Sequence, residues 1–137
     1  MKLFVLPLLL FVSASLSTEN ANSDYQAIET AVSYYLDGGT NNDFETLKKA
    51  FHPDARMISM GNDMMNVNAL EFFGSRMKPG PPTDRKTRVV DINMSGNAAS
   101  ARLEIEYDDF MFVDYMSLLK MDGEWKIVSK VYTRVNK

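Results

Sequence analysis

The dipeptide Asp122-Gly123 constrains the fold of this chain more than any other feature. It stands between two segments rich in alternating apolar and polar residues. Asp-Gly in that setting favours a two-residue hairpin turn, because the central residues of the turn need positive φ angles. The end of the chain is therefore predicted to form one antiparallel hairpin of fixed register. Counted outward from the turn, the predicted pairs are Met121–Glu124, Leu118–Ile127, Met116–Ser129 and Asp114–Val131.

Two further turns extend this hairpin into a four-stranded meander. Gly96-Asn97 is a weaker turn of the same kind, and Asp108-Asp109 joins the two middle strands. Together the three registers place apolar residues on one face, and a slip of one residue would scatter that set. The pairs that the two further turns predict include Val90–Leu103, Asp91–Arg102, Ile92–Ala101, Leu103–Asp114 and Ile105–Phe112.

The opposite face of the predicted sheet mixes charged residues with large apolar ones. Tyr115, Leu119 and Tyr132 project from it beside Arg102 and Lys130. A contiguous apolar patch of this kind usually marks an interaction surface. We therefore expect a second copy of the chain to cover this face, giving a homodimer through Tyr115, Leu119 and Tyr132.

Three helices are predicted before the meander. Residues 24–37 carry one apolar stripe, which Gly38-Gly39 ends. A second helix begins at Asn42 or the next residue and ends at Pro53, and Asn68 caps a third.

A short hairpin, residues 56–60 and 64–66, lies between the second and third helices. This order of elements predicts an α+β fold, in which a cone-shaped, curved antiparallel sheet wraps around three N-terminal helices.

The start of the chain has the pattern of a secretory signal peptide. A lysine precedes an uninterrupted apolar run at residues 3–12, and small residues follow, so we expect cleavage after Ala14 or Ser17. The run is too short to cross a bilayer, which takes about 20 apolar residues. The predicted parts are a signal peptide (1–17), a short tether (18–23) and one secreted or periplasmic domain (24–137) without a membrane span.

The composition narrows the possible functions. A net charge of −3 argues against a nucleic-acid partner, which would require a basic surface. The absence of cysteine excludes disulfides and thiolate metal sites, and a single histidine offers no imidazole cluster for zinc. We accordingly expect no metal site and no cofactor.

Asp114 is the candidate site residue that the pattern marks most clearly. The predicted register makes it the one carboxylate on the apolar face of the meander, between Leu103 and Val131. A carboxylate there must find hydrogen-bond partners or keep its proton. Two hypotheses stay open: Asp114 lines a site as a general acid or base, or it accepts structural hydrogen bonds.

His52 and several aromatic residues are further candidates. His52 could share a pocket with Asp114 as a proton shuttle, or bond the last carbonyl groups of the second helix. Tyr34 and Trp125 could stack on a flat ligand, although a large aromatic residue such as Trp125 is more often part of the core.

Four motifs together resemble a known family. Their order and spacing over residues 24–133 are similar to the family named "Putative lumazine-binding", in the nuclear-transport-factor-2-like superfamily with the ketosteroid isomerases and SnoaL-like cyclases. The resemblance implies a curved sheet around helices, a pocket at the open end of the cone, and homodimers through the outer sheet face. The motifs are Tyr35-Leu36-Asp37-Gly38, Phe51-His52-Pro53-Asp54-Ala55, Asp114-Tyr115 with Leu118-Leu119-Lys120, and Gly123-Glu124-Trp125-Lys126-Ile127-Val128-Ser129-Lys130.

Three functional hypotheses follow. The first is an exported, non-catalytic domain whose cone binds a small, partly aromatic molecule, such as a lumazine or another pteridine. The second is an acid–base enzyme, an isomerase, cyclase or dehydratase, that uses Asp114 and His52. The third is a dimeric interaction module with a filled cone. The residues expected to bind the ligand are Asp114, Tyr34, Trp125, Met116, Leu103 and Met57.

Overall fold

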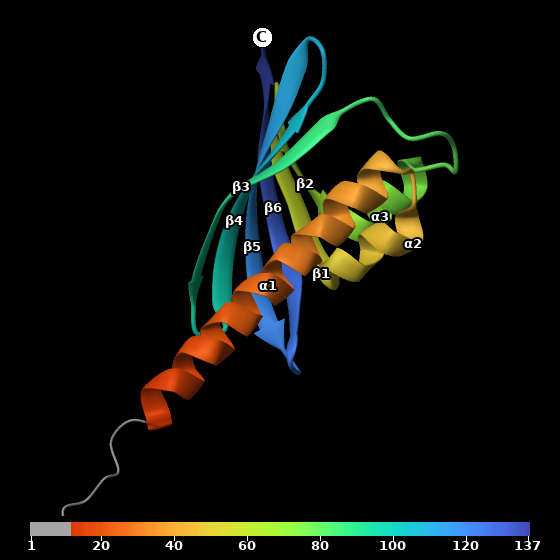
Figure 1. Cartoon of the computed structure of the whole chain (residues 1–137). Coiled ribbons are helices and arrows are strands. Elements are labelled where there is room, and N and C mark those ends of the chain that lie inside the picture. Colours follow the sequence, from red (N-terminus) through yellow and green to blue (C-terminus); the bar gives the residue numbers. More distant parts are fainter. Residues whose placement is uncertain (1–11) are drawn as a thin grey trace, which may run out of the picture.

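The computed structural model describes the backbone of residues 12–137 and the side chains from residue 18 onward. Its helices lie across one face of a curved six-stranded sheet (Figure 1). Most of the predicted signal peptide, residues 1–11, lies outside the described residues, and the signal-peptide prediction stays untested. Among the residues described, no helix is both long and apolar enough to cross a membrane.

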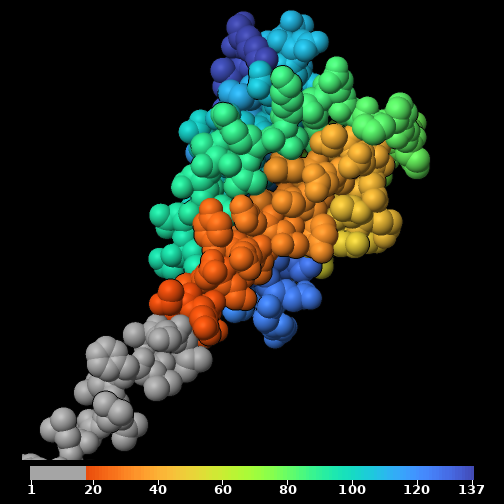
Figure 2. Space-filling view, viewed as in Figure 1, coloured from red at the N-terminus to blue at the C-terminus, as the bar shows by residue number. Residues whose placement is uncertain are grey.

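Helix α1 (Val12–Thr40) is longer than predicted at both ends. It runs through residues 18–23, where we expected a tether, and past Gly38-Gly39, where we expected it to end. Gly38 instead permits a close helix contact, because a Cβ atom there would lie 2.5 Å from the backbone nitrogen of Leu47. In the space-filling view α1 lies between β3 and α2 (Figure 2).

The second helix is shorter than predicted. Helix α2 (Phe44–Leu47) is capped by Asp43, whose Oδ1 accepts a hydrogen bond from the Thr46 N–H at 3.1 Å. A 3-10 turn, η1 (Lys48–Ala50), leads directly into strand β1 (Phe51–Met60). His52 therefore lies in a strand and not at the end of a helix.

The third helix begins where the sequence predicts. Strand β2 (Met64–Asn68) is followed by α3 (Ala69–Arg76), and the Asn68 side chain accepts a hydrogen bond from the Glu71 N–H at 3.0 Å. The predicted capping role of Asn68 is confirmed.

The sheet has the strand order β2-β1-β6-β5-β4-β3. Its other strands are β3 (Lys86–Ser95), β4 (Ala98–Glu106), β5 (Phe110–Met121) and β6 (Glu124–Asn136). The α+β cone is confirmed, but the sheet is mixed rather than antiparallel throughout, because β1 runs parallel to β6. The reason is that α3 and the loop after it carry the chain to the far edge of the sheet before the meander begins.

The registers follow the predicted turns as far as two β-bulges. The pairs Leu118–Ile127, Ile92–Ala101 and Leu103–Asp114 are confirmed. One bulge leaves Val90 unpaired, so Val89 stands opposite Leu103 and Val90 is exposed.

The second bulge lies in β6 and alters the interior of the cone. Ser117 pairs with Ser129 while Leu118 pairs with Ile127, so Val128 is the extra residue. Beyond it, Lys130 stands opposite Met116 and Tyr132 opposite Asp114, in place of the predicted Ser129 and Val131. Lys130 and Tyr132 therefore face the helices, whereas Val131 is 44% exposed on the outer face.

Candidate functional site

Asp114 lies at the centre of a buried polar cluster. Its side chain is completely buried on the inner face of β5. The Tyr35 hydroxyl group, from α1, donates a hydrogen bond to Asp114 Oδ2 at 2.7 Å. Lys130 Nζ, from β6, lies 3.1 Å from Asp114 Oδ1 and forms an ion pair with it. Three elements thus bring an acid, a phenol and an amine together.

Lys130 is in this cluster because of the bulge at Val128. Strict alternation from the hairpin turn predicted Lys130 on the outer face, and that prediction is wrong. Its Nζ atom also lies 3.8 Å from the centre of the Tyr132 ring and 5.6 Å from that of Tyr35. These cation–π contacts partly replace the water that burial removes.

Burial shifts the acid–base properties of the cluster. It lowers the pKa of Lys130, because a buried ammonium group loses its hydration, and the nearby Asp114 carboxylate offsets part of that effect. Burial, and next to it the negative charge of Asp114, raise the pKa of the Tyr35 hydroxyl group well above its ordinary value. Tyr35 therefore holds its proton and acts as a hydrogen-bond donor.

A cavity of about 240 Å³ opens beside this cluster within the cone. Aromatic and aliphatic side chains make up most of its wall, and Lys130, Arg85 and the phenol groups supply polar atoms. Asp114 is not itself in the wall, but Tyr35 and Lys130, which contact it, are. The lining residues are Tyr35, Met57, Phe72, Phe73, Arg85, Ile105, Tyr107, Phe112, Lys130 and Tyr132.

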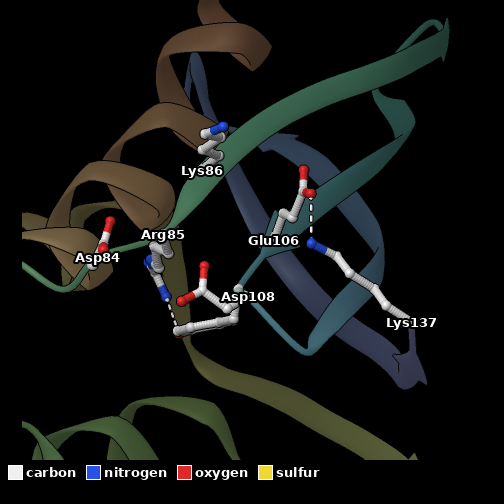
Figure 3. Close-up of a pocket in the computed structure, with 7 residues that line it drawn as sticks. Asp84, Arg85, Lys86, Glu106, Asp108 and Lys137 are labelled. Carbon is white, nitrogen blue, oxygen red and sulfur yellow. Dashed lines mark hydrogen bonds and ion pairs between the residues drawn. The ribbon is translucent and has the colours of Figure 1, made fainter.

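Arg85 and Tyr107 separate this cavity from a second, polar hollow of about 160 Å³. Arg85 Nη1 donates to the Tyr107 hydroxyl oxygen at 3.2 Å, and Arg85 Nη2 donates to the Leu36 carbonyl oxygen at 3.1 Å. Figure 3 shows the polar hollow, where Lys137 Nζ also donates to Glu106 at 2.7 Å. No motif in the sequence marked Arg85 or Tyr107.

His52 is not part of the cluster around Asp114. It lies at the start of β1, where its Nδ1 accepts a hydrogen bond from the Asp54 N–H at 3.1 Å, and its side chain is partly exposed. It is not among the residues that line the cone cavity. The two residues of the predicted acid–base pair therefore occupy different places.

The remaining predicted ligand-binding residues fall into two groups. Met57 lines the cone cavity, and Leu103 and Met116 are fully buried beside Asp114 in the sheet. Tyr34 and Trp125 line a separate hollow of about 320 Å³ between α1 and the β5–β6 turn.

Trp125 also makes a structural contact with the side chain of Asp24 in α1. Its Nε1–H donates to Asp24 at 3.0 Å, and Lys120 donates to the same carboxylate oxygen at 2.8 Å. These hydrogen bonds lower the pKa of Asp24.

The part of the chain with described side chains contains no group of three or more acidic, histidine or cysteine residues placed to hold a metal ion.

Comparisons with known proteins agree on the fold. An NTF2-like protein from Shewanella baltica superposes with a TM-score of 0.74 at 29% identity, covering 82% of this chain and 94% of that one. A ketosteroid isomerase-like protein from Erwinia carotovora atroseptica gives 0.66 at 15% identity, covering 82% and 96%.

Sequence comparison adds one relative with a named activity. The aldolase FrzH of a Cladobotryum species is 22% identical over 114 residues, which are 81% of this chain and 91% of that protein. The model of the family described as "Putative lumazine-binding" matches residues 23–133. Since that match spans most of the chain and the structure has the NTF2-like cone, the protein belongs to this family.

Proposed function

We propose that the cone cavity binds a small, partly aromatic molecule with a hydrogen-bond acceptor such as a carbonyl oxygen. The observation that carries this proposal is the placement of Lys130 in the wall of a cavity whose other lining residues, apart from Arg85, are aromatic or aliphatic. A ligand pocket typically combines apolar walls with a few convergent polar groups, and this cavity has that composition.

The bonding of Lys130 supports an acceptor on the ligand. An ammonium group has three N–H donors. Among the residues with described side chains, Lys130 Nζ has one oxygen partner, Asp114 Oδ1, and its other charge-stabilising contacts are the Tyr35 and Tyr132 rings. A ligand oxygen in the cavity would give the buried charge a second oxygen partner. A pteridine such as lumazine, with carbonyl groups on a flat ring, meets these requirements.

Calorimetric titration with lumazine tests the proposal. Tyr132→Ala removes an aromatic wall of the cone cavity, and we expect it to weaken binding at least about tenfold, or 1.4 kcal/mol. Tyr34→Ala, in the hollow between α1 and the β5–β6 turn, is the matched control and should leave the affinity unchanged. Loss of binding in Tyr34→Ala alone would move the site to that hollow, and no binding by the wild type would reject lumazine.

A second candidate function is acid–base catalysis. The buried Tyr35–Asp114–Lys130 cluster favours it, as does the relative named as an aldolase. In this version Lys130 and Tyr35 take the place that the sequence suggested for His52, because they contact both Asp114 and the cavity. The filled-cone hypothesis has less support, since a cavity is present.

We further propose that the outer sheet face pairs two copies of the chain. Tyr115, Leu119 and Val131 are all exposed there, and Tyr115 is 53% exposed. We expected Tyr132 in this contact, but its side chain faces the cone cavity, so Tyr132 is not part of the proposed dimer contact. Val131 takes its place because of the bulge at Val128.

Export of the chain remains our proposal from the sequence. N-terminal sequencing of the protein recovered from outside the cytoplasm would test it. A start at residue 15 or 18 supports cleavage of the signal peptide. A retained Met1 would contradict it.

A further inference from the structure

Lys130 has the surroundings of a nucleophilic amine. Its side chain is 5% exposed, and its Nζ lies between a carboxylate and the faces of two aromatic rings. Lysine becomes nucleophilic when an apolar or cationic environment favours the neutral amine. Here burial and, more weakly, the positive charge of Arg85 act in that direction, against Asp114.

We propose that Lys130 forms an imine with an aldehyde or ketone bound in the cone cavity. The inference rests on the proposed function, because it places the carbonyl group of the ligand at the same amine. It goes beyond that function, because it assigns a covalent bond to a named atom.

The neighbouring groups can supply every proton that the step needs. Asp114 takes one proton from the ammonium group, and the neutral amine adds its electron pair to the carbonyl carbon, forming a C–N bond. The amine then passes a proton to the former carbonyl oxygen, giving a carbinolamine. Protonated Asp114 returns its proton to that hydroxyl group, which leaves as water while the nitrogen electron pair forms the C=N bond. One ammonium group and one carbonyl compound thus give one iminium ion and one water.

The geometry favours the iminium product over the free amine. The positive nitrogen of the iminium ion would stay about as close to Asp114 Oδ1 as the ammonium nitrogen is, at 3.1 Å. Tyr35, which donates to the other carboxylate oxygen at 2.7 Å, keeps Asp114 oriented toward Lys130. The Lys130 side chain is only 5% exposed, so bulk water, which would hydrolyse the imine, has little access to its nitrogen.

The cavity wall also indicates the class of carbonyl compound. Phe72, Phe73 and Phe112 line it together with Met57 and Ile105. Such a wall suits an aldehyde or ketone that carries an aromatic or short alkyl group, and disfavours a sugar with many hydroxyl groups.

Labelling of the full-length protein with 2,4-pentanedione tests the inference. This diketone condenses with a neutral amine to an enaminone that absorbs ultraviolet light, and peptide mass spectrometry locates the modified lysine. At neutral pH we expect Lys130 to react at least about tenfold faster than Lys126, because its burial favours the neutral, nucleophilic amine. Lys126 is the internal reference because it lies on the same strand but borders the hollow between α1 and the β5–β6 turn.

Two variants extend the test. Lys130→Arg keeps the positive charge beside Asp114 but removes the nucleophile, so the fast labelling seen at Lys130 in the wild type should disappear. Lys126→Arg should label at Lys130 like the wild type. If Lys130→Arg fails to fold, the peptide map of the wild type still decides.

The failures of the two proposals are distinguishable. If lumazine binds but Lys130 reacts no faster than Lys126, the imine is wrong and the pocket stands. If Lys130 reacts fast but lumazine neither binds nor slows the labelling, the imine stands and the ligand class is wrong.

Discussion

At the scale of the residue, the Tyr35–Asp114 hydrogen bond is the contact that orders the site. Asp114 was predictable because alternation from a hairpin turn placed it on the apolar face, and it is fully buried there. The inward position of Lys130 could not be predicted, because no residue pattern in β6 indicates a bulge at Val128. Arg85 was equally hidden, since its partners Leu36 and Tyr107 are far from it in sequence.

Tyr35→Phe is predicted to lower the free energy of unfolding at pH 7. The variant removes the donor to a buried carboxylate, which costs about 1.5–3 kcal/mol. Urea denaturation measures the difference, and Tyr34→Phe, the exposed neighbour on α1, should change little. Equal effects of both variants would contradict a special role for Tyr35.

The stability difference between the wild type and Tyr35→Phe is also predicted to depend on pH, with a defined sign. The folded state raises the pKa of Tyr35, so its contribution is complete below the unfolded pKa, near 10, and is lost as the pH rises through the folded pKa. Above pH 10 the stability difference between wild type and Tyr35→Phe should therefore shrink. A difference that stays constant into strong alkali would show that Tyr35 is not shifted.

At the scale of the element, the bulge in β6 decides which side chains enter the cone. Deleting Val128 removes the extra residue but leaves Ser129 opposite Ser117 and Lys130 opposite Met116. Deleting Val131 cannot be accommodated in this way. Either every residue after Lys130 moves to the opposite face of the sheet, or the bulge is lost and Lys130 itself changes face.

The two valine deletions are therefore predicted to differ. Deletion of Val128 should keep a cooperative fold with fast labelling of Lys130. Deletion of Val131 should cost at least about 2 kcal/mol more in the free energy of unfolding. Denaturation curves and the labelling assay measure both effects, and equal losses would mean that the bulge does not set the register.

At the scale of the whole molecule, local and long-range features were unequally predictable. Turn residues and the Asn68 cap act over a few positions, so the meander and the start of α3 could be predicted. The parallel pairing of β1 with β6 joins distant segments without a turn between them, and no local pattern reports it. The cone therefore followed from the order of elements, and the mixed sheet did not.

Dimerisation through the outer face is predicted to be sensitive to charge. Leu119→Lys places a buried charge in the proposed contact of Tyr115, Leu119 and Val131, so the dimer should dissociate to monomer at micromolar concentration. Light scattering after size-exclusion chromatography measures the mass. Met64→Lys, on exposed β2, is the control and should remain dimeric. A wild-type monomer would contradict the proposed contact.

The central claim is that the cavity beside Lys130 and Asp114 holds the ligand. A crystal structure of the protein soaked with lumazine tests it most directly. We predict density for the ring in the cone cavity, against the side chains of Phe112 and Tyr132, with a carbonyl oxygen within hydrogen-bond distance, about 3 Å, of Lys130 Nζ. Density for the ring only in the hollow beside Tyr34 and Trp125, with the cone cavity empty, would contradict the claim.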